Sequence, residues 1–144
     1  MDYEVIISGG GLNGITLALA LNHAGISVAI IDKQARETLS CSDFTGRSYA
    51  LSSASKKMLS ALNVWPSLNS KAQPMLEIKV TDGCIDEKPS PFAMHFNKRD
   101  FNDGPMGFVV EDRHLRHALL KSLADTNVAY FPEVEIIKQT LNGP

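Results

Sequence analysis

The feature that most constrains this chain is a glycine-rich turn close to its N-terminus. Gly9, Gly11 and Gly14 follow residues 3–8, an apolar stretch rich in β-branched side chains that predicts a short strand. The same glycines open residues 12–24, where apolar residues cover nearly the whole circumference of a predicted helix. We therefore expect a buried strand and a buried helix joined by a tight turn.

A second strand completes the unit. Gly25 would end the helix, and residues 27–32 predict a second strand whose interior is apolar and shows no polar alternation, which is typical of a strand inside a parallel sheet. Asp32 ends this strand. The glycine spacing, the two strands and the terminal acid together predict a Rossmann-like, dinucleotide-binding βαβ unit over residues 3–32, and hence an α/β fold.

Each glycine has a different role in such a turn. Gly9 permits the tight bend, Gly11 lets a pyrophosphate approach the backbone, and Gly14 lets the helix pack closely on the strand. The N–H groups at the start of the helix, at Leu12 and Asn13, have no intrahelical partner. Because the helix dipole adds about 0.3–1 kcal/mol for an anion there, the sequence predicts a phosphate site made of backbone.

Asp32 is the candidate contact to the sugar. Its carboxylate can accept hydrogen bonds from a ribose diol and would repel a 2′-phosphate, which argues against NADP. The alternative is a purely structural turn beside an ordinary surface acid. The coincidence of a strand, the glycine spacing, a buried helix, a second strand and a terminal acid favours a bound nucleotide. The turn alone does not distinguish NAD from FAD, because both carry the same adenosine diphosphate.

The rest of the chain mixes helices with antiparallel strands. Residues 75–81 alternate apolar and polar side chains, which predicts a half-buried strand, and residues 92–96 would pair with it as a β-hairpin. Ser52 or Ser53, and later Asp112, are suited to cap helices. The expected order is a cofactor loop over 33–51, a helix over 52–63, strands within 75–111, a helix over 112–124 and strands within 127–138.

Composition excludes several classes of function. Lys and Arg number 14 against 16 Asp and Glu, and they are scattered, so we expect no nucleic-acid partner. Residues 15–31, the most apolar stretch, are interrupted by polar residues and too short to cross a bilayer core of roughly 30 Å. With no secretory signal either, we expect a cytoplasmic location. Neither Cys41 and Cys84 nor the four histidines show metal-ligand spacing, and no catalytic triad is visible.

Three segments carry a resemblance to a known family. They are residues 5–14 (VIISGGGLNG), residues 46–52 (GRSYALS) with residues 62–65 (LNVW), and residues 106–111 (MGFVVE) followed by two leucines. The chain resembles the class A flavoprotein aromatic hydroxylases, and most closely the 2-polyprenyl-6-methoxyphenol hydroxylases of ubiquinone biosynthesis. The resemblance implies FAD as cofactor, NAD(P)H as electron donor, and transfer of one hydroxyl group from dioxygen to a polyprenyl phenol.

The resemblance also implies further contacts to the cofactor. Arg47 matches an arginine near the FAD pyrophosphate and the flavin. A solvated loop arginine is the alternative, but the position of Arg47 in the long irregular loop after Asp32, directly before a predicted apolar helix, favours the cofactor role. Arg113 matches a polar contact to FAD only loosely, and a solvated helix face is the alternative. Val134 matches a position whose backbone meets the adenine. Lys33, directly after Asp32, is expected to carry an exposed side chain at the edge of the site.

Family members are several hundred residues long, and their second fingerprint, an Asp-Gly pair beside the flavin, has no counterpart here. We therefore expect a truncated N-terminal part of an FAD-binding domain, without its substrate parts, that binds FAD weakly and hydroxylates nothing. Apolar surface without its sheet partners would favour self-association. The substrate class leaves open a peripheral association with the inner membrane or with a biosynthetic complex. The alternatives are a non-catalytic nucleotide-binding fragment and another FAD-dependent oxidoreductase.

Overall fold

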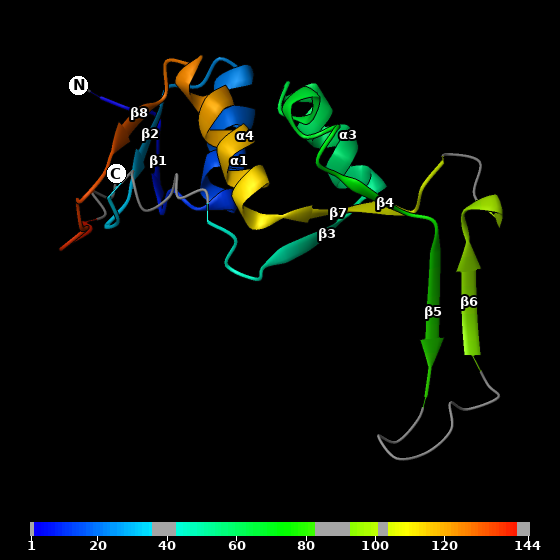
Figure 1. Cartoon of the computed structure of the whole chain (residues 1–144). Helices are drawn as coiled ribbons and strands as arrows, with labels where there is room; N and C mark the ends of the chain where they lie inside the picture. Colours follow the sequence, from blue (N-terminus) through cyan, green and yellow to red (C-terminus); the bar gives the residue numbers. More distant parts are fainter. Residues whose placement is uncertain (1, 36–42, 83–92, 101–103, 141–144) are drawn as a thin grey trace.

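The βαβ unit forms a parallel sheet with helices on one side. The computed structural model describes residues 2–35, 43–82, 93–100 and 104–140. Strands β1 (Val5–Ser8), β2 (Val28–Ile31) and β8 (Ala129–Phe131) lie parallel in the order β1-β2-β8, with Val5 beside Val28 and Ala29 beside Ala129. Helix α1 (Leu12–His23) packs on this sheet, and α4 (Asp112–Ala124) packs against α1 (Figure 1). The α/β class and the central parallel position of β2 are therefore confirmed.

Burial of the first strand and helix is less complete than the sequence predicts. Ile6 in β1 is 57% exposed and Leu17 in α1 is 50% exposed, whereas Ile7, Ile15 and Ala18 are buried. The helices shown in Figure 1 cover one face of the sheet, so side chains that alternate to the other face stay accessible. The expectation of a fully buried strand was wrong for that reason. The expectation of a fully buried helix was also wrong, because Leu17 lies on a side of α1 that lines an open cavity.

A second, antiparallel sheet lies beside the first layer. Its order is β3 (Ser48–Ser52), β7 (Gly107–Glu111) and β4 (Gln73–Met75), and it carries α3 (Ser53–Ala61) and the short helix η1 (Trp65–Ser67). The cofactor loop expected over 33–51 thus ends in a strand instead of running to 51. The local sequence of residues 48–52 does not predict a strand. The segment becomes one because it pairs with β7, which follows more than fifty residues later.

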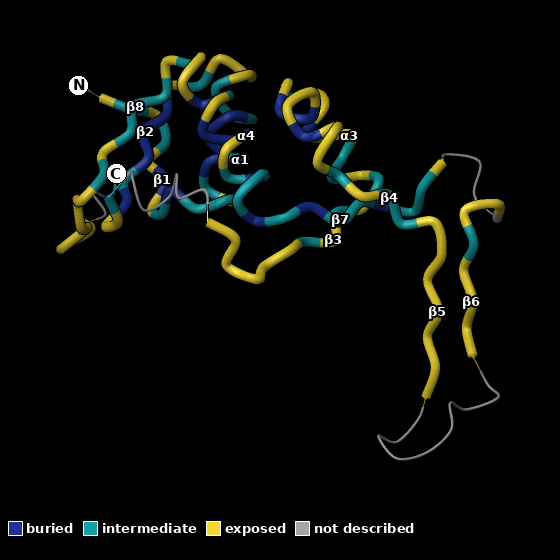
Figure 2. The backbone as a smooth tube through the Cα atoms, in the orientation of Figure 1, coloured by how far each residue is buried: buried dark blue, intermediate teal, exposed yellow. Residues whose placement is uncertain are grey.

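The predicted hairpin is present, but it is exposed. Strands β5 (Glu77–Thr81) and β6 (Ala93–Asn97) pair antiparallel, with Ile78 opposite Phe96 and Val80 opposite Met94, and the short helix η2 (Lys98–Asp100) follows. Figure 1 shows this hairpin projecting away from the rest of the chain, and Figure 2 shows both strands exposed apart from the end of β6, which is intermediate. The expectation of a half-buried strand over 75–81 was wrong, because nothing in the described residues covers its apolar side.

The predicted capping residue is confirmed for α3 and wrong for α4. The hydroxyl of Ser52 accepts a hydrogen bond from the Ser55 amide at 3.1 Å and so caps α3. Helix α4 begins at Asp112, but Glu111 occupies the cap position, so Asp112 lies in the first turn. After β8, Glu133 adopts φ of +57°, and residues 134–137 form no strand, which corrects the expectation of strands as far as 138.

One hydrophobic cluster joins the two sheets through the helices. It combines Ile7 and Ile30 of the parallel sheet with Leu115 and Leu119 of α4, and it extends to Trp65 of η1. None of the described helices has the length and apolarity needed to cross a membrane. Cys41, Cys84 and Phe92, the first residue of the predicted strand over 92–96, fall outside the described residues.

Candidate dinucleotide-binding crevice

A cavity of about 500 Å³ opens at the carboxyl ends of β1 and β2, where nucleotides bind in open α/β sheets. It brings together five residues that the sequence singles out, namely Gly9, Gly11, Asp32, Lys33 and Val134. Its other lining residues are Ser8, Ile31, Gln34, Arg116, Glu135 and Ile136. We refer to this cavity as the crevice.

The glycine turn has the geometry that its predicted roles require. Gly9 has φ of +106°, in a region that favours glycine, and its amide donates to the Ile31 carbonyl at 2.8 Å. A Cβ at Gly14 would clash with the carbonyl oxygen of Gly9, whereas a Cβ at Gly11 would meet nothing within 4 Å. Gly14 is therefore required by the turn itself, while Gly11 leaves open space beside the crevice.

The start of α1 is open to an anion. Gly11 occupies the cap position without a side-chain hydrogen bond, and the first turn contains no acidic residue. The N–H groups of Leu12, Asn13 and Gly14 therefore have neither an intrahelical partner nor a side-chain cap. The side chains of Leu12 and Asn13 line a separate apolar cavity of about 490 Å³, so only their backbone can serve the crevice.

Asp32 is buried and held from two sides. It is 9% exposed, the Gly10 amide donates to its Oδ2 atom, and the Gln34 amide donates to its Oδ1 atom at 2.7 Å. Its carbonyl oxygen accepts from the Val134 amide at 3.0 Å, which anchors the segment after β8 to the crevice. Because each carboxylate oxygen can accept two hydrogen bonds, both oxygens keep capacity for the hydroxyl groups of a ligand.

Gly10 is a site residue that sequence reasoning missed. A Cβ at this position would clash with the hydroxyl and the ring of Tyr130 in β8. The run of three consecutive glycines was the available signal, but the reason for the middle glycine lies in a strand far along the chain. Gly10 therefore does two things, since its amide also orients Asp32.

The two predicted arginines lie outside the residues that line the crevice. Arg47 has an exposed side chain, and its carbonyl accepts the Asp112 amide at 3.0 Å. Arg113 donates from Nε to Glu111 Oε2 at 2.6 Å, and its guanidinium lies 5.6 Å from the centre of the Phe44 ring. Their contacts to a cofactor remain predictions. Arg116, which the sequence analysis did not single out, lines the crevice.

Arg116 belongs to a polar network centred on Asp112, which is 6% exposed. Its Nε donates to Asp112 Oδ2 at 2.6 Å, and the Tyr49 hydroxyl donates to Oδ1 at 3.0 Å. Burial alone would raise the pKa of the Asp112 carboxyl, but these hydrogen bonds, with the charges of Arg116 and Arg47, lower that pKa below its ordinary value. Asp112 is therefore a charged acceptor at neutral pH.

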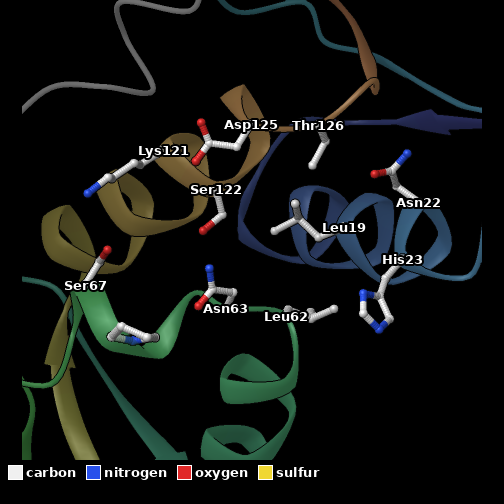
Figure 3. Close-up of a pocket in the computed structure, with 11 residues that line it drawn as sticks. Leu19, Asn22, His23, Leu62, Asn63, Ser67, Lys121, Ser122, Asp125 and Thr126 are labelled. Atoms are coloured by element: carbon white, nitrogen blue, oxygen red, sulfur yellow. The ribbon is translucent and has the colours of Figure 1, made fainter.

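A second polar cavity, of about 470 Å³, lies at the opposite ends of the helices (Figure 3). His23 belongs to the last turn of α1, Lys121 and Ser122 to the end of α4, and Asn63 to the turn after α3. Helix C-termini carry partial negative charge and present carbonyl groups. This cavity therefore suits a diphosphate less well than the crevice, where a helix begins.

Comparison with known proteins identifies the family of the chain. Residues 2–137 match a family described as FAD binding domain. The chain is 40% identical over 120 residues to "Ubiquinone hydroxylase UbiL" of Rhodospirillum rubrum, covering 83% of this chain and 27% of that protein. It is 30% identical over 129 residues to human "Ubiquinone biosynthesis monooxygenase COQ6, mitochondrial", covering 84% of this chain and 26% of that protein.

Solved structures show the same fold at low sequence identity. The flavoprotein/dehydrogenase from Cytophaga hutchinsonii superposes with a TM-score of 0.71 at 20% identity, over 99% of this chain and 33% of that one. PqsL, a probable FAD-dependent monooxygenase from Pseudomonas aeruginosa, superposes with a TM-score of 0.65 at 17% identity, over 96% and 35%. The chain thus spans about a quarter to a third of the length of these proteins. It belongs to the FAD-binding domain family of the flavoprotein monooxygenases.

Proposed function

We propose that the crevice binds the adenosine diphosphate half of FAD. The observation that carries this proposal is the meeting of an uncapped helix start, an open glycine at position 11 and the buried, oriented Asp32 in one cavity. The match over residues 2–137 supports FAD as the nucleotide. An uncapped helix start would otherwise leave backbone N–H groups without partners, which a diphosphate satisfies.

Each part of the nucleotide has a proposed contact. The amides of Leu12, Asn13 and Gly14 face the diphosphate, and Asp32 accepts from the ribose hydroxyls. Because the Val134 amide is already bonded to Asp32, its carbonyl is the backbone group left for the amino group of adenine. Lys33 is exposed at the ribose side, where it adds positive charge without a fixed contact.

Arg47 and Arg113 are proposed as outer contacts, on the strength of the family resemblance. Arg47 follows Gly46, which has φ of +79°, directly before β3, and its exposed side chain can move toward the flavin side of the diphosphate. Arg113 would first have to leave Glu111, with which it is paired at 2.6 Å. Of the two, Arg47 therefore needs the smaller rearrangement.

For the whole protein we propose NAD(P)H- and O2-dependent hydroxylation of a phenolic ring, in particular a polyprenyl phenol of ubiquinone biosynthesis. The names of the relatives, "Ubiquinone hydroxylase" and "Ubiquinone biosynthesis monooxygenase", support this substrate class. Bound FAD supplies the redox chemistry, and the residues of this chain bind and orient it. Such a substrate fits a cytoplasmic location, with the protein peripheral to the inner membrane or bound to a biosynthetic complex.

The test is a calorimetric titration of FAD, NAD⁺ and NADP⁺ into the chain and its Gly11→Ala variant. We expect FAD to bind most tightly and NADP⁺ most weakly, since its 2′-phosphate meets Asp32. A methyl group at position 11 meets no protein atom within 4 Å, so the variant should keep the melting temperature of the wild type but lose FAD affinity. If a folded Gly11→Ala variant bound FAD with unchanged affinity, the proposal that the diphosphate binds at this turn would be wrong.

A further inference from the structure

The crevice has a cation that the glycine turn does not predict. Arg116 comes from the second turn of α4, yet its side chain lines the same cavity as Gly9, Gly11 and Asp32. The side chain is 25% exposed and therefore accessible to a ligand. Arg113, one turn earlier, is engaged with Glu111 and Phe44 and does not line the cavity.

Arg116 is held by one edge of its guanidinium group. Its Nε donates to Asp112 Oδ2 at 2.6 Å, and the other oxygen of that carboxylate is fixed by the Tyr49 hydroxyl at 3.0 Å. The Asp112 amide is bonded in turn to the Arg47 carbonyl, which ties α4 to the start of β3. An arginine has five N–H donors in a rigid fork, so the two Nη groups are left for a ligand.

The charges that line the crevice indicate that the Arg116 guanidinium could neutralise part of the charge of a bound diphosphate. A diphosphate brings two anionic phosphates, while the start of α1 offers about half a positive charge. Lys33 and Arg116 are the cationic lining residues, and Asp32 and Glu135 are acidic. Lys33 adjoins Asp32 and so lies at the sugar, which leaves Arg116 for the phosphates.

We propose that Arg116 binds a phosphate oxygen of the dinucleotide through its Nη groups, and that Asp112 and Tyr49 are positioning residues for it. This inference rests on the proposed function of the crevice. It adds a side-chain phosphate contact from α4 to a site otherwise made of backbone amides.

The test compares ligands with and without phosphate. FAD, ADP and adenosine are titrated by calorimetry into the wild type, Arg116→Gln, Arg116→Lys and the control Lys121→Gln, which removes a cation from the far end of α4. We expect Arg116→Gln to weaken FAD and ADP about tenfold, as for a lost charge-assisted hydrogen bond, and to leave adenosine unchanged. Arg116→Lys should lie between, because lysine keeps the charge but not the fork. Lys121→Gln should match the wild type.

Arg116→Gln leaves the buried Asp112 carboxylate without its partner and could unfold the chain. The double variant Asp112→Asn/Arg116→Gln removes both charges, and it should show the same loss for ADP with a melting temperature near that of the wild type. Asp112→Asn alone should weaken ADP less than Arg116→Gln does, again without an effect on adenosine.

Unchanged ADP affinity in Arg116→Gln, or an equal loss for ADP and adenosine, would overturn the role of Arg116 while leaving the crevice as the nucleotide site. A wild-type chain that bound neither ADP nor FAD would overturn the proposed function, and this inference with it.

Discussion

At the residue scale, the glycines of the turn differ in what a methyl group would meet. At Gly14 it would clash with the Gly9 carbonyl, a backbone atom that cannot move aside cheaply. Alanine would gain about 1 kcal/mol of helix propensity, but overpacking typically costs about 1–3 kcal/mol, and here it also distorts the turn. We expect Gly14→Ala to lower the free energy of unfolding by about 2 kcal/mol without any ligand. Urea unfolding followed by circular dichroism measures this, and a variant as stable as the wild type would contradict the tight packing.

Asp112 should make stability depend on pH. Its pKa is lowered in the folded chain, so the folded state favours the charged carboxylate. The stabilisation is present above the pKa of the unfolded chain, about 3.9, and is lost as the pH falls through the lower folded value. We expect Asp112→Asn to be less stable than the wild type at pH 7 and this difference to shrink below about pH 4. A difference that stayed constant from pH 7 to pH 3 would refute the effect.

At the scale of elements, the sequence predicted what local patterns control. The helix expected over 112–124 coincides with α4, and α3 lies within the range expected over 52–63, because both have apolar periodicity and clear ends. Strands β3 and β4 were not predicted, since both exist by pairing with β7 from distant sequence. The exposure of β5 was mispredicted because alternation shows that a strand has an apolar side but not whether anything covers it.

The hairpin β5–β6 is expected to cause self-association through a second copy of the chain. Its apolar side presents Ile78, Val80, Met94 and Phe96, all exposed, and among the described residues no third strand pairs with either edge of this two-stranded ribbon. We expect sedimentation velocity to show oligomers that grow with concentration, and Ile78→Lys to shift them toward monomer. Lys79→Gln, on the polar side of the same strand, is the matched control and should not. A wild-type chain that stays monomeric at high concentration would contradict this prediction.

At the scale of the whole molecule, the crevice is assembled from three distant parts of the chain. The glycine turn and Asp32 were predictable, because strand, turn and second strand are contiguous. Arg116 and the segment after β8 were harder to place: one reaches the crevice because α4 packs against α1, and the other because Val134 bonds to Asp32. Sequence reasoning therefore predicted the backbone part of the site and missed a side chain that depends on tertiary packing.

The chain is expected to bind FAD without turning over NAD(P)H. The crevice residues have proposed contacts to the adenosine diphosphate half, which takes no part in electron transfer, and the chain spans 27% of the length of UbiL. With FAD added to saturation, we expect NADH to be oxidised in air at the rate of free FAD at the same concentration, and a phenol substrate to remain unhydroxylated by mass spectrometry. The Gly11→Ala variant serves as control, because it should abolish binding and leave that rate unchanged. Oxidation well above the rate of free FAD, or any hydroxylated phenol, would mean that the described residues also organise the flavin, and the crevice would then have to extend beyond the nucleotide.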